Sequence, residues 1–227
     1  MLPFRIRAAG DAALVLELPA VVDEATSARL IAIADAVRSR YGAILRDAVV
    51  GYHTLTVYFD PLAVDGAWMA GELEALAASD TASAPPSGGS VDIPVCYGGE
   101  FGPDLPDVAA AAGCSPDDVV ELHTSRPYRV FVIGFVPGFA YMGPVDERLA
   151  LPRRSSPRTR VPPGSVAIAA GQTGIYPMET PGGWHILGRT PLRPFDETRA
   201  QPVLFRVGDR VRFHAISAAE YARTATW

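Results

Sequence analysis

The alternation of apolar and polar residues along the first 79 positions predicts a small α+β domain. Apolar residues recur at every second position in residues 4–7, 14–18 and 54–59, as they do in half-buried strands. Residues 23–40 instead place apolar side chains at helical spacing, with Asp23 at the N-cap position. A second amphipathic helix follows Asp65. The predicted order is therefore strand, strand, helix, strand, strand, helix.

Residues 80–90, DTASAPPSGGS, are predicted to form a linker between two domains. The segment consists of small and polar residues, is rich in proline and glycine, and shows no hydrophobic period. It separates a first domain, residues 1–79, from a second domain, residues 91–227.

The second domain is predicted to begin with a strand at residues 91–97, which is followed by two short helices. The second of these helices has clear signals at its ends. Ser115 stands at the N-cap, Pro116 at the first helical position, and Asp118 three residues after the cap. We expect this helix to stop before Pro127.

From Tyr128 onward the pattern predicts many short strands, which favours a barrel or a sandwich. Residues 130–133 are apolar on both faces, so their strand is expected to be buried. Pro137–Gly138 predicts a turn, and Gly208–Asp209 predicts a type II′ hairpin turn.

Residues 183–190, GWHILGRT, come close to the P-loop pattern GxxxxGK[ST], with Arg189 in place of the lysine. Bulky residues occupy most of the free positions, so the backbone cannot wrap a phosphate closely. Pro191 and Pro194 follow, and they prevent the helix that a P-loop requires. The segment is therefore predicted to be a β-strand.

A strand at this place has consequences for the side chains. Its periodicity predicts that His185, Leu187 and Arg189 share one face, while Trp184 and Ile186 face the core. His185 and Arg189 would then lie ~13 Å apart and could line one cleft. A hydrogen-bonded histidine within a barrel is an equally good interpretation of His185.

Composition narrows the classes of function. The net charge is −5 and no basic helix is present, which argues against a nucleic-acid partner. No apolar run reaches ~20 residues and the N-terminal pattern does not match a signal peptide, so we expect a cytoplasmic protein without a membrane segment. All 20 basic residues are arginine, which excludes a Walker lysine and a biotin-carrying lysine in this chain.

Arginines cluster in the proline-rich segment at residues 152–163, where Arg153, Arg154, Arg158 and Arg160 occur. Clustered guanidinium groups on a stiff loop suit a carboxylate, a phosphate or an acidic partner surface. A solvated loop with local ion pairs is an equally good interpretation.

Aromatic residues surround the predicted Pro-Gly turn. Phe135, Phe139 and Tyr141 could form the wall of a ligand site, although such residues more often pack in a core.

Gln172 is predicted to share a strand face with Val166 and Ile168 and to lie just beyond them. A glutamine at the end of an apolar strand face is either a satisfied cap or a contact to a substrate amide. Tyr176 follows in the same turn.

Metal binding and nucleophilic catalysis find little support. The histidines, His53, His123, His185 and His214, lack metal-binding spacing, so no metal site is expected. Ser165 does not stand in a GxSxG elbow.

Five ordered segments together resemble the family of 5-oxoprolinase B subunits, also called the KipI or allophanate hydrolase subunit 1 family. These segments are IPVCYGGEFGPDLPDVA, FVIGFVPGFAYMG, PRRSSPRTRVPPGSVAIAAGQTGIYP, PGGWHILGRTPLRPFD and GDRVRF. The resemblance covers essentially the whole chain. It implies an α+β fold in which a small ferredoxin-like domain precedes a cyclophilin-like β-barrel domain.

The resemblance also implies partners and an activity. A member of this family would act with the C subunit, which is similar to allophanate hydrolase subunit 2, and with the A subunit. Together they would catalyse the ATP-dependent opening of 5-oxo-L-proline to L-glutamate, and a member would be inactive alone. ATP would be used by the complex, without a P-loop or a biotin attachment site in this chain. The family leaves two alternatives open: an inhibitor of a sensor histidine kinase, and a carboxyltransferase component of a urea carboxylase or allophanate pathway.

Transferred to this sequence, the family pattern implies two groups of site residues. The catalytic group is His185, Gln172 and Arg189. The substrate-binding group is Tyr176, Arg154, Arg160, Phe139 and Tyr141.

Overall fold

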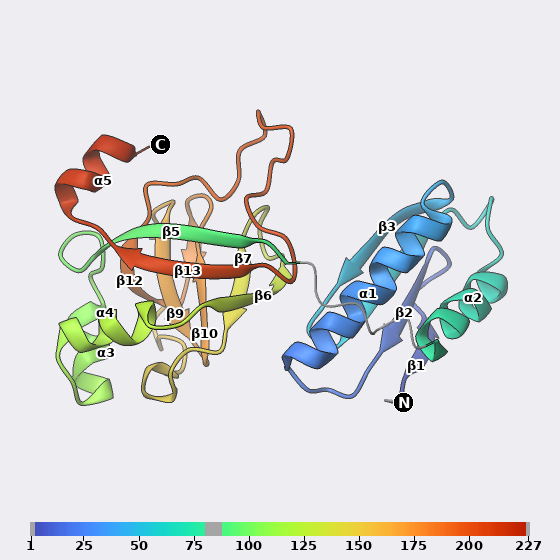
Figure 1. Ribbon diagram of the computed structural model, residues 1–227, viewed down its shortest axis with the longest axis horizontal. Coiled ribbons are helices and arrows are strands. Elements are labelled where there is room, and N and C mark those ends of the chain that lie inside the picture. Colours follow the sequence, from blue (N-terminus) through green and yellow to red (C-terminus); the bar gives the residue numbers. More distant parts are fainter. Residues whose placement is uncertain (1–2, 80–87, 226–227) are drawn as a thin grey trace. The chain divides into compact units, whose positions relative to one another are not determined.

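The computed structural model describes residues 3–79 and 88–225, which belong to two compact units (Figure 1). The first unit comprises Met1–Ser87 and the second Gly88–Trp227. Most of the predicted linker, residues 80–87, lies outside the described residues, and the first strand of the second unit begins at Ser90.

The first unit is a four-stranded antiparallel sheet with two helices. Its elements are β1 (Arg5–Ala8), β2 (Ala13–Glu17), α1 (Glu24–Tyr41), β3 (Leu45–Val50), β4 (Thr54–Phe59) and α2 (Gly66–Ala78). The strand order is β1-β2-β4-β3. Since β2 and β3 are both antiparallel to β4, they run parallel to each other, and α1 connects them. This split βαβ unit is the core of a ferredoxin-like domain, as predicted.

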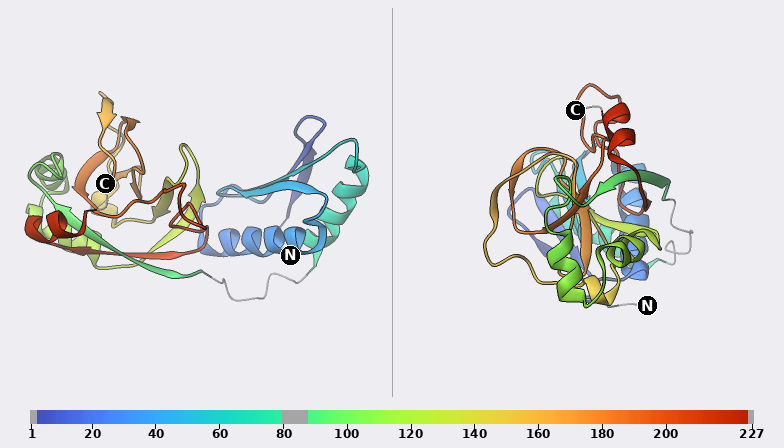
Figure 2. Two further views of the ribbon diagram at one scale, coloured as in Figure 1. Left: turned by 90° about the horizontal axis from the view of Figure 1, so that it is seen from above. Right: turned by 90° about the vertical axis from the view of Figure 1, so that its left-hand side faces the viewer.

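Local signals set the helix positions in this unit. The Asp23 side chain accepts a hydrogen bond of 2.6 Å from the Thr26 amide, and Asp65 accepts one of 2.8 Å from the Trp68 amide. Helix α1 lies along one face of the sheet (Figure 2). Its buried residues include Leu30, as the helical spacing predicts.

The second unit contains a closed barrel with the strand order β10-β7-β6-β13-β5-β12-β9. The barrel strands are β5 (Ser90–Tyr97), β6 (Tyr128–Ile133), β7 (Ala140–Gly143), β9 (Ser165–Ala169), β10 (Gln172–Ile175), β12 (His185–Arg189) and β13 (Arg210–Ala215). β5 and β13 pair in parallel, and they lie side by side in Figure 1. The predicted barrel is confirmed.

The remaining elements surround the barrel. They are α3 (Leu105–Ala112), α4 (Pro116–Thr124), the 3-10 helix η2 (Glu147–Leu149), β8 (Arg158–Val161), β11 (Thr180–Gly182) and α5 (Ala218–Thr224). β8 and β11 form a separate two-stranded sheet. Helix α4 has the predicted capping box between Ser115 and Asp118, and it ends before Pro127.

The barrel interior is apolar and receives side chains from every barrel strand. Examples are Val95 on β5, Met142 on β7, Ile168 on β9 and Phe213 on β13. The apolar face of helices α3 and α4 joins this cluster, and Val119 is fully buried there.

A buried histidine connects α4 to the barrel through a chain of hydrogen bonds. His123 Nδ1 lies 2.7 Å from Tyr97 Oη, and Nε2 lies 2.8 Å from Thr173 Oγ1. Because the Thr173 hydroxyl donates to the Ala167 carbonyl at 3.2 Å, it accepts from Nε2, and Nδ1 accepts from Tyr97. Burial lowers the pKa of His123 to about 3. The ring is therefore neutral.

One predicted turn is confirmed and another is wrong. At Pro137–Gly138 the Phe139 amide donates to the Val136 carbonyl at 3.1 Å, and Gly138 has a φ of +83°. Gly208 has a φ of +97°, but it is the third residue of a turn in which the Asp209 amide donates to the Arg206 carbonyl at 3.1 Å. That is the type II pattern, not II′. No strand directly precedes this turn, because β13 pairs with β5 and β6 instead.

Candidate functional site

A second apolar cluster lies on the outer face of the barrel, where β7, β9, β10 and β12 meet. Ala167 and Ala169 point away from the interior, opposite to Ile168, and Phe139 and Trp184 pack over them. Gly174 on β10 makes this packing close, since a Cβ there would lie 2.9 Å from the Phe139 ring. Small residues on the strands thus leave room for large rings above them.

The rings of this cluster contact one another edge to face. The Phe139 centroid lies 4.8 Å from that of Tyr141, 5.2 Å from that of Tyr176 and 5.5 Å from that of Trp184. Such pairs favour one fixed arrangement of the rings. The result is a rigid aromatic wall.

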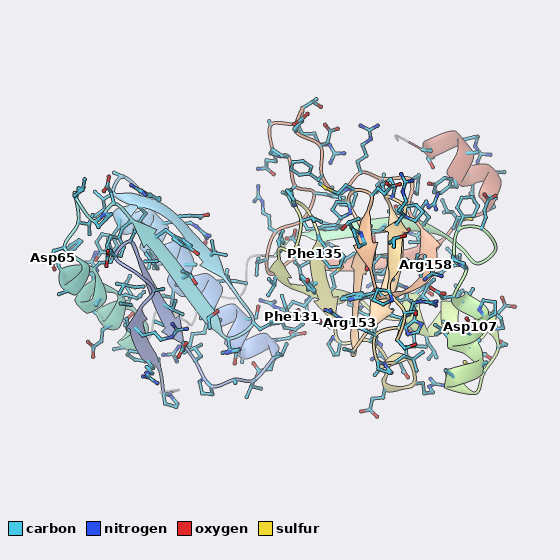
Figure 3. The ribbon with its side chains drawn as sticks, turned by 180° about the vertical axis from the view of Figure 1, so that it is seen from behind. Asp65, Asp107, Phe131, Phe135, Arg153 and Arg158 are labelled. Carbon is cyan, nitrogen blue, oxygen red and sulfur yellow. The ribbon has the colours of Figure 1, made fainter. Side chains whose placement is uncertain are left out.

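This wall borders a pocket of about 280 Å³. The pocket is lined by Phe135, Phe139, Tyr141, Arg153, Arg154, Pro157, Tyr176, Pro181, Gly182, Gly183 and Trp184. Phe135 stands out among them, because it is 61% exposed and has a φ of +71°. A bulky residue in this conformation is unusual. Figure 3 looks toward the face that carries Phe135, Arg153 and Arg158.

Tyr176 is held tightly at the base of the pocket. It is 2% exposed, and a Cβ on Gly182 would overlap its hydroxyl. Burial raises the pKa of Tyr176, while the hydrogen bond from the Trp184 amide and the charge of Arg153 act in the opposite direction. Burial also raises the pKa of Tyr141, against the same Arg153 charge. Both hydroxyls therefore keep their protons at neutral pH.

A buried carboxylate anchors the arginine-rich loop to the barrel. Asp104 is 2% exposed and accepts two hydrogen bonds from Arg158, at 2.8 and 2.7 Å, and one from Arg154 at 2.7 Å. It also accepts from the Ile186 amide at 2.7 Å. Burial alone would raise the pKa of Asp104, but these hydrogen bonds and the two positive charges lower it. Asp104 stands 50 residues before Arg154, so the sequence carried no signal for this contact.

The loop arginines therefore differ in what they can bind. Arg154 lines the pocket but is tied to Asp104, while exposed Arg160 forms an ion pair with Glu179 at 2.8 Å outside the pocket. Arg153 is exposed and lines the pocket, and it makes no ion pair within residues 3–79 and 88–225. Local ion pairs explain part of the cluster. The sequence placed Arg153 in this cluster, but the family pattern implied Arg154 and Arg160 as the substrate-binding arginines.

His185 contacts this loop at Pro152 and does not line the pocket. Its Nε2 donates to the Pro152 carbonyl at 2.9 Å, because a carbonyl can only accept. The histidine thereby fixes the residue that directly precedes Arg153.

The prediction that Arg189 shares a face with His185 and Leu187 is wrong, although His185 and Leu187 do lie on one side of β12. Trp184 and Ile186 belong to the outer-face cluster and not to the barrel interior. β12 contains a bulge: Ile186 pairs with Ala167, but Gly188 pairs with Val166, leaving Leu187 as the extra residue. One extra residue reverses the phase of everything after it. Arg189 contacts Phe101 and Tyr221 instead, and none of these three residues lines the pocket.

The predicted face of Gln172 is also wrong. A two-residue turn at Ala170–Gly171, with φ values of +49° and +79°, separates β9 from β10. Gln172 opens β10 and pairs with Ala169, so it lies on the outer face rather than with Ile168. It does not line the pocket.

Of the residues implied to bind substrate, the pocket brings together Phe139, Tyr141, Arg154 and Tyr176. Within the described residues, no group of three or more His, Cys, Asp or Glu side chains could hold a metal ion. No helix among them has the length and apolarity to cross a membrane.

Comparison with known proteins identifies relatives over most of the chain. The family described as "Carboxyltransferase domain, subdomain C and D" matches residues 4–205. The chain is 42% identical over 209 residues to the 5-oxoprolinase B subunit of Escherichia coli O157:H7, covering 90% of this chain and 92% of that protein. It is 52% identical over 131 residues to that of Bacillus subtilis, covering 58% of this chain and 55% of that protein.

A more distant relative and a solved structure also match this chain. A putative urea carboxylase of Emericella nidulans is 25% identical over 114 residues, which are 47% of this chain and 9% of that protein. The crystal structure of TTHA0988 superimposes with a TM-score of 0.80 at 37% identity, covering 94% of this chain. This chain spans 40% of the TTHA0988 chain.

Proposed function

Because this chain belongs to the family of carboxyltransferase subdomains C and D, and within it to the 5-oxoprolinase B subunits, we propose that it is one component of a hydrolase complex that opens 5-oxo-L-proline to L-glutamate with ATP. The observation that carries the proposal is the match to the E. coli protein over nine tenths of both chains. The word subunit in the name of that relative implies partners, for which the A and C subunits of 5-oxoprolinase are the candidates.

The chemistry explains why the complex consumes ATP. A lactam is a resonance-stabilised amide, and water at neutral pH attacks its carbonyl carbon slowly. Transfer of the ATP γ-phosphoryl group to the amide oxygen makes the ring carbon electrophilic. Water then adds to this carbon, the C–N bond breaks, and phosphate leaves, so that ATP, water and 5-oxoproline become ADP, phosphate and glutamate.

In this proposal the outer-face pocket is this chain's part of the active site. The aromatic wall of Phe139, Tyr141 and Trp184 would hold the flat lactam ring, and the protonated Tyr176 hydroxyl can donate to the lactam oxygen. ATP would be held elsewhere in the complex, because residues 185–189 form a barrel strand and not a phosphate cradle.

His185 has a positioning role in this proposal, and neither His185 nor Gln172 lines the pocket. His185 holds the loop through Pro152, and Gln172 lies on the same outer face as the pocket. Arg189, next to Tyr221, would act in the stability of the barrel rather than in chemistry.

The alternative functions have weaker support. The match to a urea carboxylase covers less than half of this chain, and a biotin-dependent reaction would need another chain to supply the biotin. No observation on this chain favours inhibition of a histidine kinase.

The test is reconstitution. This chain is co-expressed with the A and C subunits, and glutamate release from 5-oxoproline is followed with and without ATP. We expect ATP-dependent release that disappears when this chain is omitted. Glutamate release that persists without this chain would refute the proposal. A folded complex of all three subunits that releases no glutamate would also refute it.

A tyrosine pair provides a matched control. Tyr176→Phe removes the buried hydroxyl and should lower kcat/KM by about 10-fold or more. Tyr58→Phe changes an exposed tyrosine of the first unit and should leave kcat/KM unchanged.

A further inference from the structure

We propose that Arg153 is the specificity-determining residue of the outer-face pocket and that it selects small planar ligands bearing one carboxylate over neutral lactams of the same shape. The choice of 5-oxo-L-proline as the probe rests on the proposed function. The binding step itself does not, since it concerns this chain alone.

Arg153 has a free charge where its neighbours do not. Two loop arginines are paired with Asp104, and Arg160 is paired with Glu179. Arg153 lines the pocket and makes no hydrogen bond or ion pair among the residues that the structure describes. Its guanidinium is available to a ligand.

The electrostatics of the pocket favour an anion. Arg153 lines the same pocket as Tyr141 and Tyr176, and its positive charge lowers the pKa values of both hydroxyls against the effect of burial. No aspartate or glutamate is found among the described residues that line the pocket. A carboxylate entering the pocket would therefore meet an uncompensated positive charge.

The backbone on both sides of Arg153 is fixed in place. The Pro152 carbonyl accepts from His185 at 2.9 Å, and the Arg154 amide donates to the Gly183 carbonyl at 2.8 Å. Since both neighbours are held, little backbone freedom is lost when Arg153 binds a ligand. The backbone that carries Arg153 is therefore preorganised, and the cost of ordering is confined to its side chain.

The size of the pocket suits a small ligand. A volume of about 280 Å³ is close to the lower end of the ~300–1,000 Å³ range that is usual for drug-sized ligands. A nucleoside triphosphate is larger and carries several negative charges, which one free guanidinium does not neutralise. A five-membered lactam with one carboxylate matches the wall, the volume and the charge.

Isothermal titration calorimetry of the full chain tests this assignment. The two probes are 5-oxo-L-proline and 2-pyrrolidinone, which has the same ring without the carboxylate. A charge-assisted hydrogen bond predicts that 5-oxoproline binds about 10-fold to 100-fold more tightly than 2-pyrrolidinone. Arg153→Gln should bring the two dissociation constants within about 3-fold of each other.

Arg160→Gln is the matched control, since it removes an exposed arginine of the same loop that is paired outside the pocket. It should preserve the preference for 5-oxoproline. The proposal is overturned if wild type shows no preference, if wild type binds neither probe, or if Arg153→Gln keeps the preference. Equal losses in both variants would also overturn it, because the effect would then be one of net charge.

Kinetics of the reconstituted complex separate this proposal from the proposed function. With Arg153→Gln we expect KM for 5-oxoproline to rise by about 10-fold or more while kcat changes little. An active complex with an unchanged KM refutes the role of Arg153 and leaves the function standing. Selective binding by the chain, together with an inactive complete complex, refutes the function and leaves the role of Arg153 standing.

Discussion

Mild acid should destabilise the barrel through the buried His123. The folded barrel holds this ring neutral with a pKa of about 3, while the ring has an ordinary pKa of 6.5 in the unfolded chain. Below pH 6.5 the unfolded chain therefore takes up a proton that the folded state does not accept. The contribution of His123 to stability is present above pH 6.5 and falls as the pH decreases toward 3.

The size of the effect follows from the two pKa values. Each pH unit below 6.5 costs about 1.4 kcal/mol, so lowering the pH from 7 to 5 should remove about 2 kcal/mol of folding free energy. This is a large part of the roughly 5–15 kcal/mol that is usual for a domain. The carboxylates titrate mostly below this window, so the histidine signal is separable there.

Urea unfolding at pH 7, 6 and 5 measures the effect. A Trp68→Phe background removes the tryptophan of the first unit, so that fluorescence reports on the second. His123→Gln lowers stability at every pH, because it disturbs the buried hydrogen bonds, but its free energy of unfolding should depend less steeply on pH. Parallel pH profiles for the two proteins would show the reasoning to be wrong. An NMR titration of the folded wild-type protein in which His123 gains its proton above pH 5 would also show the reasoning to be wrong.

Other substitutions test the architecture of the site. Asp104→Asn leaves two guanidinium groups without their carboxylate and should cost about 2–4 kcal/mol in urea unfolding, whereas a loss below about 0.5 kcal/mol would contradict its role as an anchor. Gly182→Ala should displace the Tyr176 ring and cost about 1–3 kcal/mol, while Gly183→Ala, whose Cβ meets its nearest neighbour only at 3.6 Å, should stay within about 0.5 kcal/mol. Phe139→Ala should cost about 3–5 kcal/mol, and a smaller loss would mean that the aromatic wall collapses around the gap.

Features that depend on a few neighbouring residues could be predicted from the sequence. Asp23 and Ser115 mark the starts of α1 and α4 because each side chain caps an amide only three residues away. The bulky residues and prolines around Arg189 excluded a phosphate loop for the same local reason. The many short strands between glycines and prolines indicated a barrel or a sandwich, and the family resemblance implied the barrel.

The side of the sheet on which each site residue lies could not be predicted, because one extra residue in a bulge or a turn reverses it. The bulge at Leu187 moves Arg189 to the other side of the strand, and the amino-acid sequence carries no signal for this bulge. The turn at Ala170–Gly171 puts alanine at a positive φ, where asparagine or glycine is usual, so the sequence showed one strand instead of two. The choice among the loop arginines depends on Asp104, a contact across 50 residues.

The parallel pairing of β5 with β13 also determines when the barrel can close. β13 lies between β5 and β6, yet it is the last strand to be synthesised. Until residues 210–215 have left the ribosome, β5 and β6 are open edges that can pair with other chains. The first unit, whose elements all lie before residue 79, can fold much earlier. A nascent chain that stalls or is truncated before Arg210 would therefore join a finished small domain to an open, aggregation-prone sheet.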